Sequence, residues 1–114
     1  MFQCDDALPS ILENMLNGVA YCRMLFEDGV PQDFIYLYTN PAFHEQTGLG
    51  PVCGKRVSEV IPGIRSADPQ LFEIYGRVAA GGKPEKFETF VDSLQAWFAI
   101  QAYSPCPGHF VAVF

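Results

Sequence analysis

The chain has 114 residues and a formal charge of −6 at pH 7, with 13 acidic side chains against 7 basic ones. That length suits one domain, and 49% hydrophobic residues are too many for a disordered tail. The basic residues form no stripe for nucleic-acid phosphates, and the negative charge opposes docking on anionic lipid. No apolar run approaches the ~20 residues of a membrane helix, and the N-terminus lacks the basic start of a signal peptide. We therefore expect a cytoplasmic domain that contacts neither nucleic acid nor a membrane.

The first elements predicted along the chain are a helix and a β-hairpin. Apolar residues recur at helical spacing over residues 7–16, and Asn17-Gly18 ends that helix. Residues 19–26 and 33–39 are rich in strand-forming side chains, with a turn at 27–29 between them. The two strands should pair as a hairpin.

Helices follow the hairpin. Asn40 is a good N-cap and Pro41 suits the first helical position, so a short helix should run from there to Gly48. A helical turn is expected over 57–61. Asp68-Pro69 repeats the cap-and-proline start, and the helix after it should reach about residue 80.

Three strands complete the chain, over residues 85–91, 95–104 and 109–114. Hairpins at both ends of the sequence predict an antiparallel sheet with the helices packed on one face, which is an α+β fold. The last strands carry apolar residues at both odd and even positions, such as Trp97, Phe98 and Ile100. In a sheet with one solvent-exposed face, apolar and polar residues alternate along each strand. We therefore expect the second face to be covered by the N-terminal helix or by a second subunit, as in a homodimer.

The neighbouring residues His44 and Glu45 are a candidate reactive pair. No second histidine follows four residues later, so the two-histidine zinc pattern is absent. Adjacent helical residues also point about 100° apart, which prevents them from sharing one ion easily. We expect both side chains on the solvent side of the helix, with Phe43 and Leu49 pointing inward. A small α+β enzyme that uses these two polar residues or a cysteine stays an alternative.

Other candidate reactive groups lack parts of their motifs. The stretch GLGPVCGKR at 48–56 has Leu49 where a phosphate loop needs glycine. Cys106 and His109 lie close together, but no second ligand pair would complete a zinc site. Cys4, Cys22 and Cys53 are scattered without a C-x-x-C motif, which favours four reduced thiols over disulfides. The sequence therefore predicts a domain without catalytic or metal residues.

Several segments resemble, in order and spacing, the sensory box (PAS) domains of bacterial sensor histidine kinases, from about Leu8 to Phe114. The resemblance is carried by NGVAYCRMLFEDGVPQDFIYLYTNPAFHEQTGL, with its NPAF strand-to-helix junction, by GKRVSEVIPGI and by WFAIQAYSPCPGHFVAVF. It implies a five-stranded antiparallel sheet in a sensor domain over 18–114, with a flanking helix over 1–17. It also implies a cavity between the sheet and the helix at 69–80.

The resemblance implies a regulatory function in two-component signalling. Occupancy of the cavity by a small ligand, or contact with a partner, would be relayed through flanking helices to an effector domain of the same protein, such as a histidine kinase. The chain ends at Phe114 and is expected to be a sensor domain separated from that effector. A ligand-free dimerisation module is the alternative within the same family.

The family's known cofactors fit this sequence poorly. Flavin-binding relatives carry a reactive cysteine at a position that matches Val57, and Cys53 lies before the Gly-Lys pair that precedes it. Haem-binding relatives use a histidine on the long helix, and residues 69–80 contain none. A flavin adduct and histidine-ligated haem are therefore disfavoured, and the ligand is unknown.

The cavity wall can be predicted from strand periodicity together with the resemblance. Alternation places four residues of the strand at 95–104 on one face, and analogy with flavin-binding relatives turns that face inward. The adjacent strands should contribute their own inward residues, including Val91, Phe110 and Phe114, and Gln101, Thr89 and Tyr103 would be the polar anchors. The predicted ligand-binding residues are Leu71, Tyr75, Val78, Phe87, Thr89, Trp97, Ala99, Gln101, Tyr103 and Ala112.

Overall fold

The structure is a computed structural model that describes residues 4–114. Its elements follow the predicted order, with one additional short helix after the helical turn. They are α1 (Cys4–Asn14), β1 (Val19–Glu27), β2 (Val30–Thr39), α2 (Pro41–Thr47), α3 (Val57–Val60), α4 (Ile64–Ala67), α5 (Pro69–Ala79), β3 (Glu85–Val91), the 3₁₀ turn η1 (Asp92–Leu94), β4 (Ala96–Tyr103) and β5 (His109–Val113).

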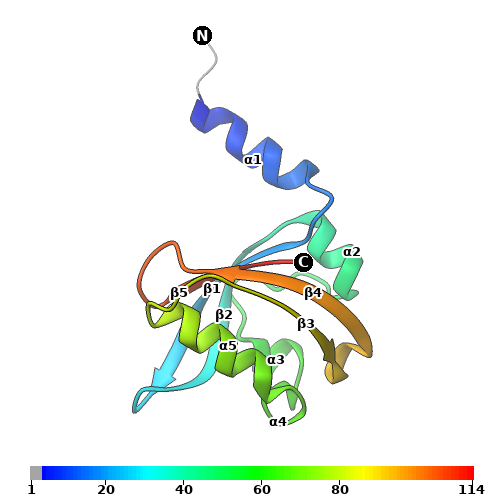
Figure 1. Ribbon diagram of the computed structural model, residues 1–114. Coiled ribbons are helices and arrows are strands. Elements are labelled where there is room, and N and C mark those ends of the chain that lie inside the picture. The colour runs from blue at the N-terminus through cyan, green and yellow to red at the C-terminus, as the bar shows by residue number, and fades with distance from the viewer. Residues whose placement is uncertain (1–3) are drawn as a thin grey trace.

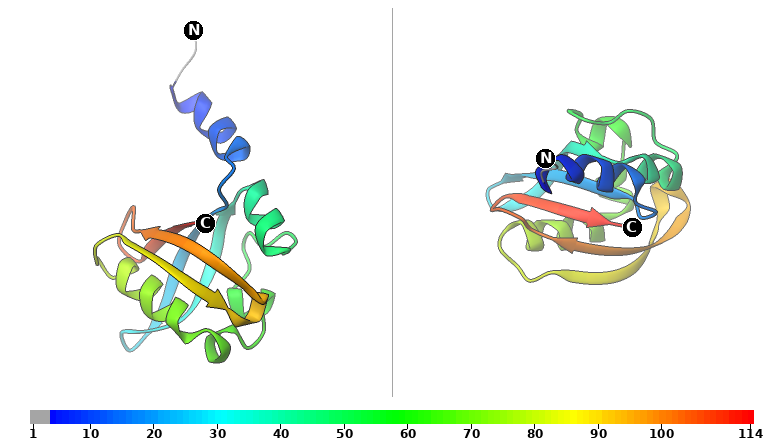
Figure 2. Two further views of the ribbon diagram at one scale, coloured as in Figure 1. Left: turned by 45° about the vertical axis from the view of Figure 1, so that its right-hand side comes forward. Right: turned by 90° about the horizontal axis from the view of Figure 1, so that it is seen from above.

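The five strands form one antiparallel sheet in the order β2-β1-β5-β4-β3. The last strand, β5, lies beside the first, β1, in the middle of the sheet (Figure 1). Helices α3, α4 and α5 pack on one face (Figure 2). The predicted α+β fold with a five-stranded antiparallel sheet is therefore confirmed.

The strand β2 begins three residues earlier than the sequence predicted. Asp28 and Gly29 both have positive φ, 53° and 76°, which is the backbone of a tight two-residue hairpin turn. Val30 therefore pairs directly with Glu27. Pro31 is tolerated within the strand because β2 lies at the edge of the sheet, where an N–H is not required for pairing.

The two predicted helix caps have different outcomes. The side-chain oxygen of Asn40 accepts a hydrogen bond from the Phe43 amide at 3.0 Å, so the cap of α2 is confirmed. Asp68 makes no such bond to its own helix. Its carboxylate instead accepts the Asp92 amide at 2.6 Å and the Ser93 amide at 3.0 Å. The prediction that Asp68 caps α5 is wrong, because the backbone after β3 supplies better-placed donors.

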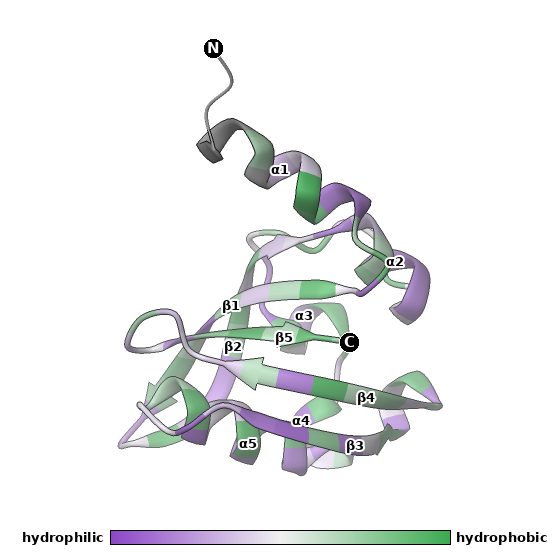
Figure 3. Cartoon of the chain, turned by 45° about the horizontal axis from the view of Figure 1, so that its top comes forward, coloured by the Kyte–Doolittle hydropathy of each residue, from purple (hydrophilic) through white to green (hydrophobic). Residues whose placement is uncertain are grey.

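Helix α1 projects away from the sheet rather than lying across it (Figures 1 and 2). The face of the sheet opposite the helices is open: Trp97 is 72% exposed, and Phe90 and Tyr103 are also exposed. Figure 3 shows apolar residues concentrated on β1 and β5 in the middle of the sheet, with more polar residues on β3. The expectation that the N-terminal helix covers this outer face is wrong, since α1 contacts mainly α2.

Within residues 4–114, no helix combines the length and the apolar character needed to span a membrane.

Candidate functional site

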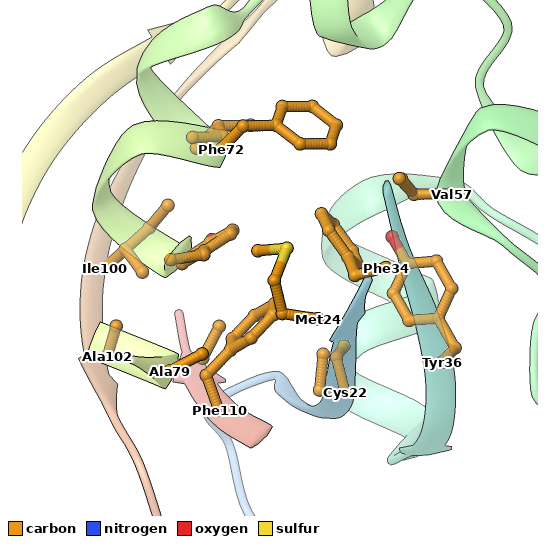
Figure 4. Packing of buried hydrophobic residues seen from close by; sticks show 14 of the residues in the cluster. Cys22, Met24, Phe34, Tyr36, Val57, Phe72, Ala79, Ile100, Ala102 and Phe110 are labelled. Atoms are coloured by element: carbon orange, nitrogen blue, oxygen red, sulfur yellow. The ribbon is translucent and has the colours of Figure 1, made fainter. Parts of the chain in front are cut away.

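A small cavity lies inside the core, between the inner face of the sheet and the helices. Its volume is about 40 Å³, which is far below the roughly 300–1,000 Å³ of typical small-molecule pockets. Figure 4 shows the surrounding side chains, with aromatic rings from β2, β5 and α5 gathered around Met24. The cavity is lined by Ala20, Cys22, Phe34, Tyr36, Phe43, Thr47, Leu49, Ile61, Ile64, Leu71, Tyr75, Val91, Leu94, Phe98, Ile100, Phe110, Ala112 and Phe114.

The polar groups on this wall are one thiol and three hydroxyls, from Cys22, Tyr36, Thr47 and Tyr75. The Thr47 hydroxyl is already used, because it donates to the Phe43 carbonyl at 2.7 Å. The hydroxyls of Tyr36 and Tyr75 make none of the hydrogen bonds found in the described part of the chain. These two hydroxyls are therefore available as hydrogen-bond donors and acceptors.

The titratable side chains on the cavity wall are uncharged. Burial raises the pKa of Tyr75 and of Tyr36, and the neighbouring Cys22 raises both further. Burial likewise raises the pKa of the Cys22 thiol, so all three groups stay protonated at neutral pH. No charged side chain of the described residues lines the wall. A charged occupant would lose its hydration without gaining a counter-ion, which excludes it on energetic grounds.

Aromatic packing holds the Tyr75 ring in place. It stacks on Phe110 with centroids 4.4 Å apart and an interplanar angle of 15°. Phe34 stands edge-on to both rings, at 5.9 Å from Tyr75 and 5.2 Å from Phe110. Such offset and edge-to-face pairs are favourable for aromatic quadrupoles. Tyr75 therefore presents its hydroxyl from a position that is fixed by β2 and β5.

The predicted wall residues on α5, β3 and β5 mostly face inward. Leu71, Tyr75 and Ala112 line the cavity, as do Val91, Phe110 and Phe114. Three others lie beside it: Val78 is fully buried, the Phe87 ring is 6.3 Å from that of Tyr75, and the Thr89 hydroxyl accepts from the Gln70 amide at 3.1 Å. Val78, Phe87 and Thr89 do not line the cavity itself, and the role of the whole set in binding stays a prediction.

The predicted wall residues on β4 point the other way. Trp97, Ala99, Gln101 and Tyr103 are exposed on the outer face, so the expectation that they face the cavity is wrong. Strand pairing sets the direction, because these residues alternate with the inward positions that oppose inward residues of β3 and β5. A shift of one residue moves every side chain to the other face. The inward residues of β4 are Phe98, Ile100 and Ala102.

Sequence reasoning also missed the contribution of the first hairpin. Cys22 on β1 and Tyr36 on β2 both line the cavity and carry polar atoms. The pattern that could have revealed them is the buried-exposed alternation along β1, in which Ala20, Cys22 and Met24 are buried and Arg23 is exposed. Register with β2 then assigns its inward residues.

Asn40 joins the helix α2 to the flanking helix α1. The residue is fully buried, and its Oδ1 accepts the Val19 amide at 2.8 Å as well as the Phe43 amide. Its Nδ2 donates to the carbonyls of Leu12 at 3.0 Å and Asn17 at 2.9 Å. All bonding positions of the side-chain amide are thus used. One residue fixes α1, the start of β1 and the first turn of α2 relative to one another.

The C-terminal residue Phe114 meets the start of β1 beside Asn40. The Phe114 amide donates to the Gly18 carbonyl at 2.8 Å, and the Asn17 side chain donates to the Phe114 carbonyl at 2.8 Å. The Gly18 amide in turn donates to Gln46 Oε1 at 3.1 Å. The ring centroids of Phe43 and Phe114 are 5.7 Å apart, and both residues line the cavity. The segment that enters β1 and the C-terminal residue Phe114 are therefore connected to the cavity wall beside α2.

His44 does not lie free on the solvent side of its helix. It is half-buried, and its Nε2 lies 2.9 Å from Thr39 Oγ1 while its Nδ1 lies 3.0 Å from the Leu49 carbonyl oxygen. Thr39 Oγ1 is also 3.8 Å from the Sγ of Cys53. The expectation of a solvated surface is wrong for His44, because the following loop folds back over the ring. It is confirmed for Glu45, which is exposed.

The Cys106–His109 segment forms the turn between β4 and β5. His109 Nδ1 lies 3.0 Å from the Pro107 carbonyl oxygen, and its ring stacks on Tyr21. Among the residues described, no three histidine, cysteine or acidic side chains gather as a metal site would require.

Comparison with known proteins finds similarity in structure alone. No family model and no curated protein matches the sequence. A domain of a sensory box sensor histidine kinase/response regulator from Geobacter sulfurreducens matches with a TM-score of 0.59 and 19% identity, over 96% of this chain and 90% of that one. A domain of an HTR-like protein from Haloarcula marismortui matches with a TM-score of 0.56 and 20% identity, over 87% and 95%.

A third structural match is a domain of a sensor histidine kinase. The photoactive yellow protein domain of the sensor histidine kinase Ppr from Rhodospirillum centenum matches with a TM-score of 0.55 and 13% identity, over 91% of this chain and 88% of that one. All three matches cover 87% or more of each chain. The strand order of the sheet and the packing of helices on one of its faces agree with that similarity. The chain has the fold of the sensory box (PAS) domains.

Proposed function

We propose that the chain is the sensory domain of a cytoplasmic signal-transduction protein, most closely fitting a sensor histidine kinase with its effector in the same protein. The domain itself carries out no reaction in this proposal. The observation that carries it is the connection of the cavity wall, through α2, to the flanking helix α1 and to the segment that enters β1. Structural neighbours drawn from sensor histidine kinases support the same context.

The ligand we infer is a small neutral molecule with a polar group. The apolar wall favours a mostly apolar body, and the hydroxyls of Tyr36 and Tyr75 favour a hydrogen-bonding group on it. The volume of about 40 Å³ admits only a few non-hydrogen atoms unless the core expands. Gln101 and Tyr103, the anchors expected from the sequence, face solvent and do not belong to this proposal.

The relay would run through α2. A ligand shifts an equilibrium only if it binds one conformation better than the other. An occupant that displaces Phe43 or Phe114 moves residues next to those that hold α1 and the C-terminal residue, because Asn40 donates to the Leu12 carbonyl and Phe114 donates to the Gly18 carbonyl. The flanking helix would then carry the change toward the effector.

A second copy of the chain is the partner that we propose for the outer face of the sheet. Trp97 and Phe90 form an exposed edge-to-face pair with centroids 5.6 Å apart, and Tyr103 extends the apolar surface. Ile11 on α1 is 55% exposed, and Leu16, in the bend between α1 and β1, is 91% exposed. Two open apolar surfaces on one small domain favour a homodimer, since such surfaces commonly mark protein contacts.

The ligand proposal is tested with three probes of similar size: cyclopentanone, cyclopentane and the charged cyclopentylammonium ion. We expect cyclopentanone to shift the NMR signals of residues that line the cavity and the cyclopentylammonium ion to leave them unchanged. Replacing Tyr75 with Phe should weaken cyclopentanone binding about fivefold, the value of one ordinary hydrogen bond, and leave cyclopentane unaffected.

Paired variants separate the cavity from the surface. Ala112→Leu fills the cavity, whereas Ala99→Leu adds the same side chain on the outer face. The first should abolish the response to cyclopentanone and the second should preserve it. If all three probes leave the cavity residues of the native chain unchanged, the core is closed and the dimerisation module becomes the better description. Native mass spectrometry of the two variants then measures that dimer directly.

A further inference from the structure

Three side chains form a hydrogen-bonded chain at the junction between β2 and α2. Cys53 Sγ lies 3.8 Å from Thr39 Oγ1, which lies 2.9 Å from His44 Nε2. The loop that carries Cys53 is held along β2, because the Gly54 amide donates to the Tyr36 carbonyl at 2.7 Å. The thiol, the hydroxyl and the imidazole all line one surface groove, separate from the core cavity.

The direction of these hydrogen bonds follows from their partners. The Leu49 carbonyl can only accept, so the hydrogen of the neutral imidazole resides on Nδ1, which is 3.0 Å from that oxygen. Nε2 is then an acceptor and takes the hydrogen of the Thr39 hydroxyl. The oxygen of Thr39 keeps its lone pairs for the Cys53 S–H. The chain therefore runs from thiol to hydroxyl to imidazole, the order that a proton transfer from sulfur requires.

Accessibility distinguishes Cys53 from the other thiols with a described environment. Cys22 is fully buried. Cys106 is exposed like Cys53, but its polar neighbour is the Tyr21 hydroxyl at 3.9 Å, and no hydrogen bond joins that hydroxyl to the adjacent His109. A phenol is a poor proton acceptor compared with an imidazole. Cys53 alone of these three combines solvent access with a path to a base.

We propose that Cys53 is a modification site for small soft electrophiles of the α,β-unsaturated carbonyl class, with His44 as the base and Thr39 as the proton carrier. The Cys53 proton passes to Thr39 Oγ1 while the Thr39 proton passes to His44 Nε2. The thiolate forms a C–S bond to the β-carbon, and the π electrons move to give an enolate. The enolate carbon takes a proton back from the imidazolium. The thiol thus adds across the double bond, and no oxidant or leaving group is needed.

This site does not depend on an occupant of the core cavity, so it stands whether or not the sensor proposal holds. It would give the domain a covalent input beside α2. His44 follows Phe43 on that helix, and Phe43 lines the cavity.

Acrylamide is the probe for the test, used on the 114-residue chain with Cys4→Ser to remove the thiol nearest the N-terminus. Peptide mass spectrometry follows Cys53, Cys106 and Cys22 in one sample. We expect Cys53 to react at least about tenfold faster than Cys106 at neutral pH, the lower end of general-base effects. Cys22 should stay unmodified, which reports an intact core in every variant.

Variants then separate proton transfer from simple exposure. Thr39→Val removes the hydroxyl and should reduce the Cys53 rate to that of Cys106, whereas Thr39→Ser should restore it. His44→Gln keeps an acceptor near Thr39 but cannot take up a proton, so it should be as slow as Thr39→Val. Equal rates at Cys53 and Cys106 in the parent chain, or an unchanged Cys53 rate in both slow variants, would overturn the proposal.

Discussion

Asn40 offers the sharpest test of how the flanking helix is attached to the core. Replacing it with Ala removes the N-cap of α2, which is worth about 1 kcal/mol. It also leaves the buried Val19 amide without a partner, at about 1–3 kcal/mol. The lost bonds to Leu12 and Asn17 lie nearer to solvent, where water can replace Asn40. We therefore expect Asn40→Ala to lower the free energy of unfolding by about 2–4 kcal/mol.

Asn40→Asp separates the two halves of this junction. A carboxylate still accepts from the Val19 and Phe43 amides, so α2 and the sheet should remain folded. It has no hydrogen to donate to the carbonyls of Leu12 and Asn17, and its charge repels both. Helix α1 should therefore detach from the core while the core stays intact.

Urea unfolding measures the first effect and amide hydrogen exchange measures the second. Exchange over residues 10–16 should rise in Asn40→Asp, with β1 and β5 unchanged. Asn14→Ala is the matched control, because the Asn14 side chain makes one exposed bond, to the Ser10 carbonyl within α1, and should cost less than about 0.5 kcal/mol. The reasoning fails if Asn40→Asp leaves α1 exchange unchanged, or if Asn40→Ala costs no more than the control.

Three further predictions concern the core and its edges. Burial alone would raise the pKa of Asp68, but hydrogen bonds from the backbone and a serine after β3 outweigh burial and lower it, so its stabilisation is present at neutral pH and is lost as pH falls below about 4. Asp68→Asn should therefore reduce unfolding free energy at pH 7 and flatten its acid dependence in urea titrations from pH 7 to 2; an unchanged acid limb would contradict this. Gly76→Ala should destabilise by about 1–3 kcal/mol despite the better helix propensity of Ala, because its Cβ would overlap the Pro31 ring, and a rise in stability would refute that contact. Glu85→Gln should change the denaturation midpoint less than Asp68→Asn or Gly76→Ala does, and only at low salt. The reason is that the ion pair with Arg77, which lowers the pKa of Glu85, is exposed to solvent. A shift of the midpoint that persists at high salt would contradict this.

Local chemistry in the sequence was sufficient for the elements and their order. Asn40-Pro41 marks a helix start because its cap and its missing amide satisfy the first turn without help from elsewhere. The hairpin turn at Asp28-Gly29 likewise depends on backbone preferences of two residues. Order, turn positions and hydrophobic spacing then indicated an antiparallel sheet with helices on one face. These features depend on residues that are close together in the sequence, so they can be predicted from it.

The tertiary structure decided which faces and which partners these elements have. Alternation divides β4 into two sets of residues but does not say which set faces the core; pairing with β3 and β5 placed Ile100 inward and Trp97 outward. His44 acquired Thr39 and Leu49 as partners, and Asp68 acquired backbone amides from beyond β3, through contacts between separate segments. A contact of that kind depends on the packed arrangement of the whole chain, because the free energy of burial is shared among all the elements that exclude water together.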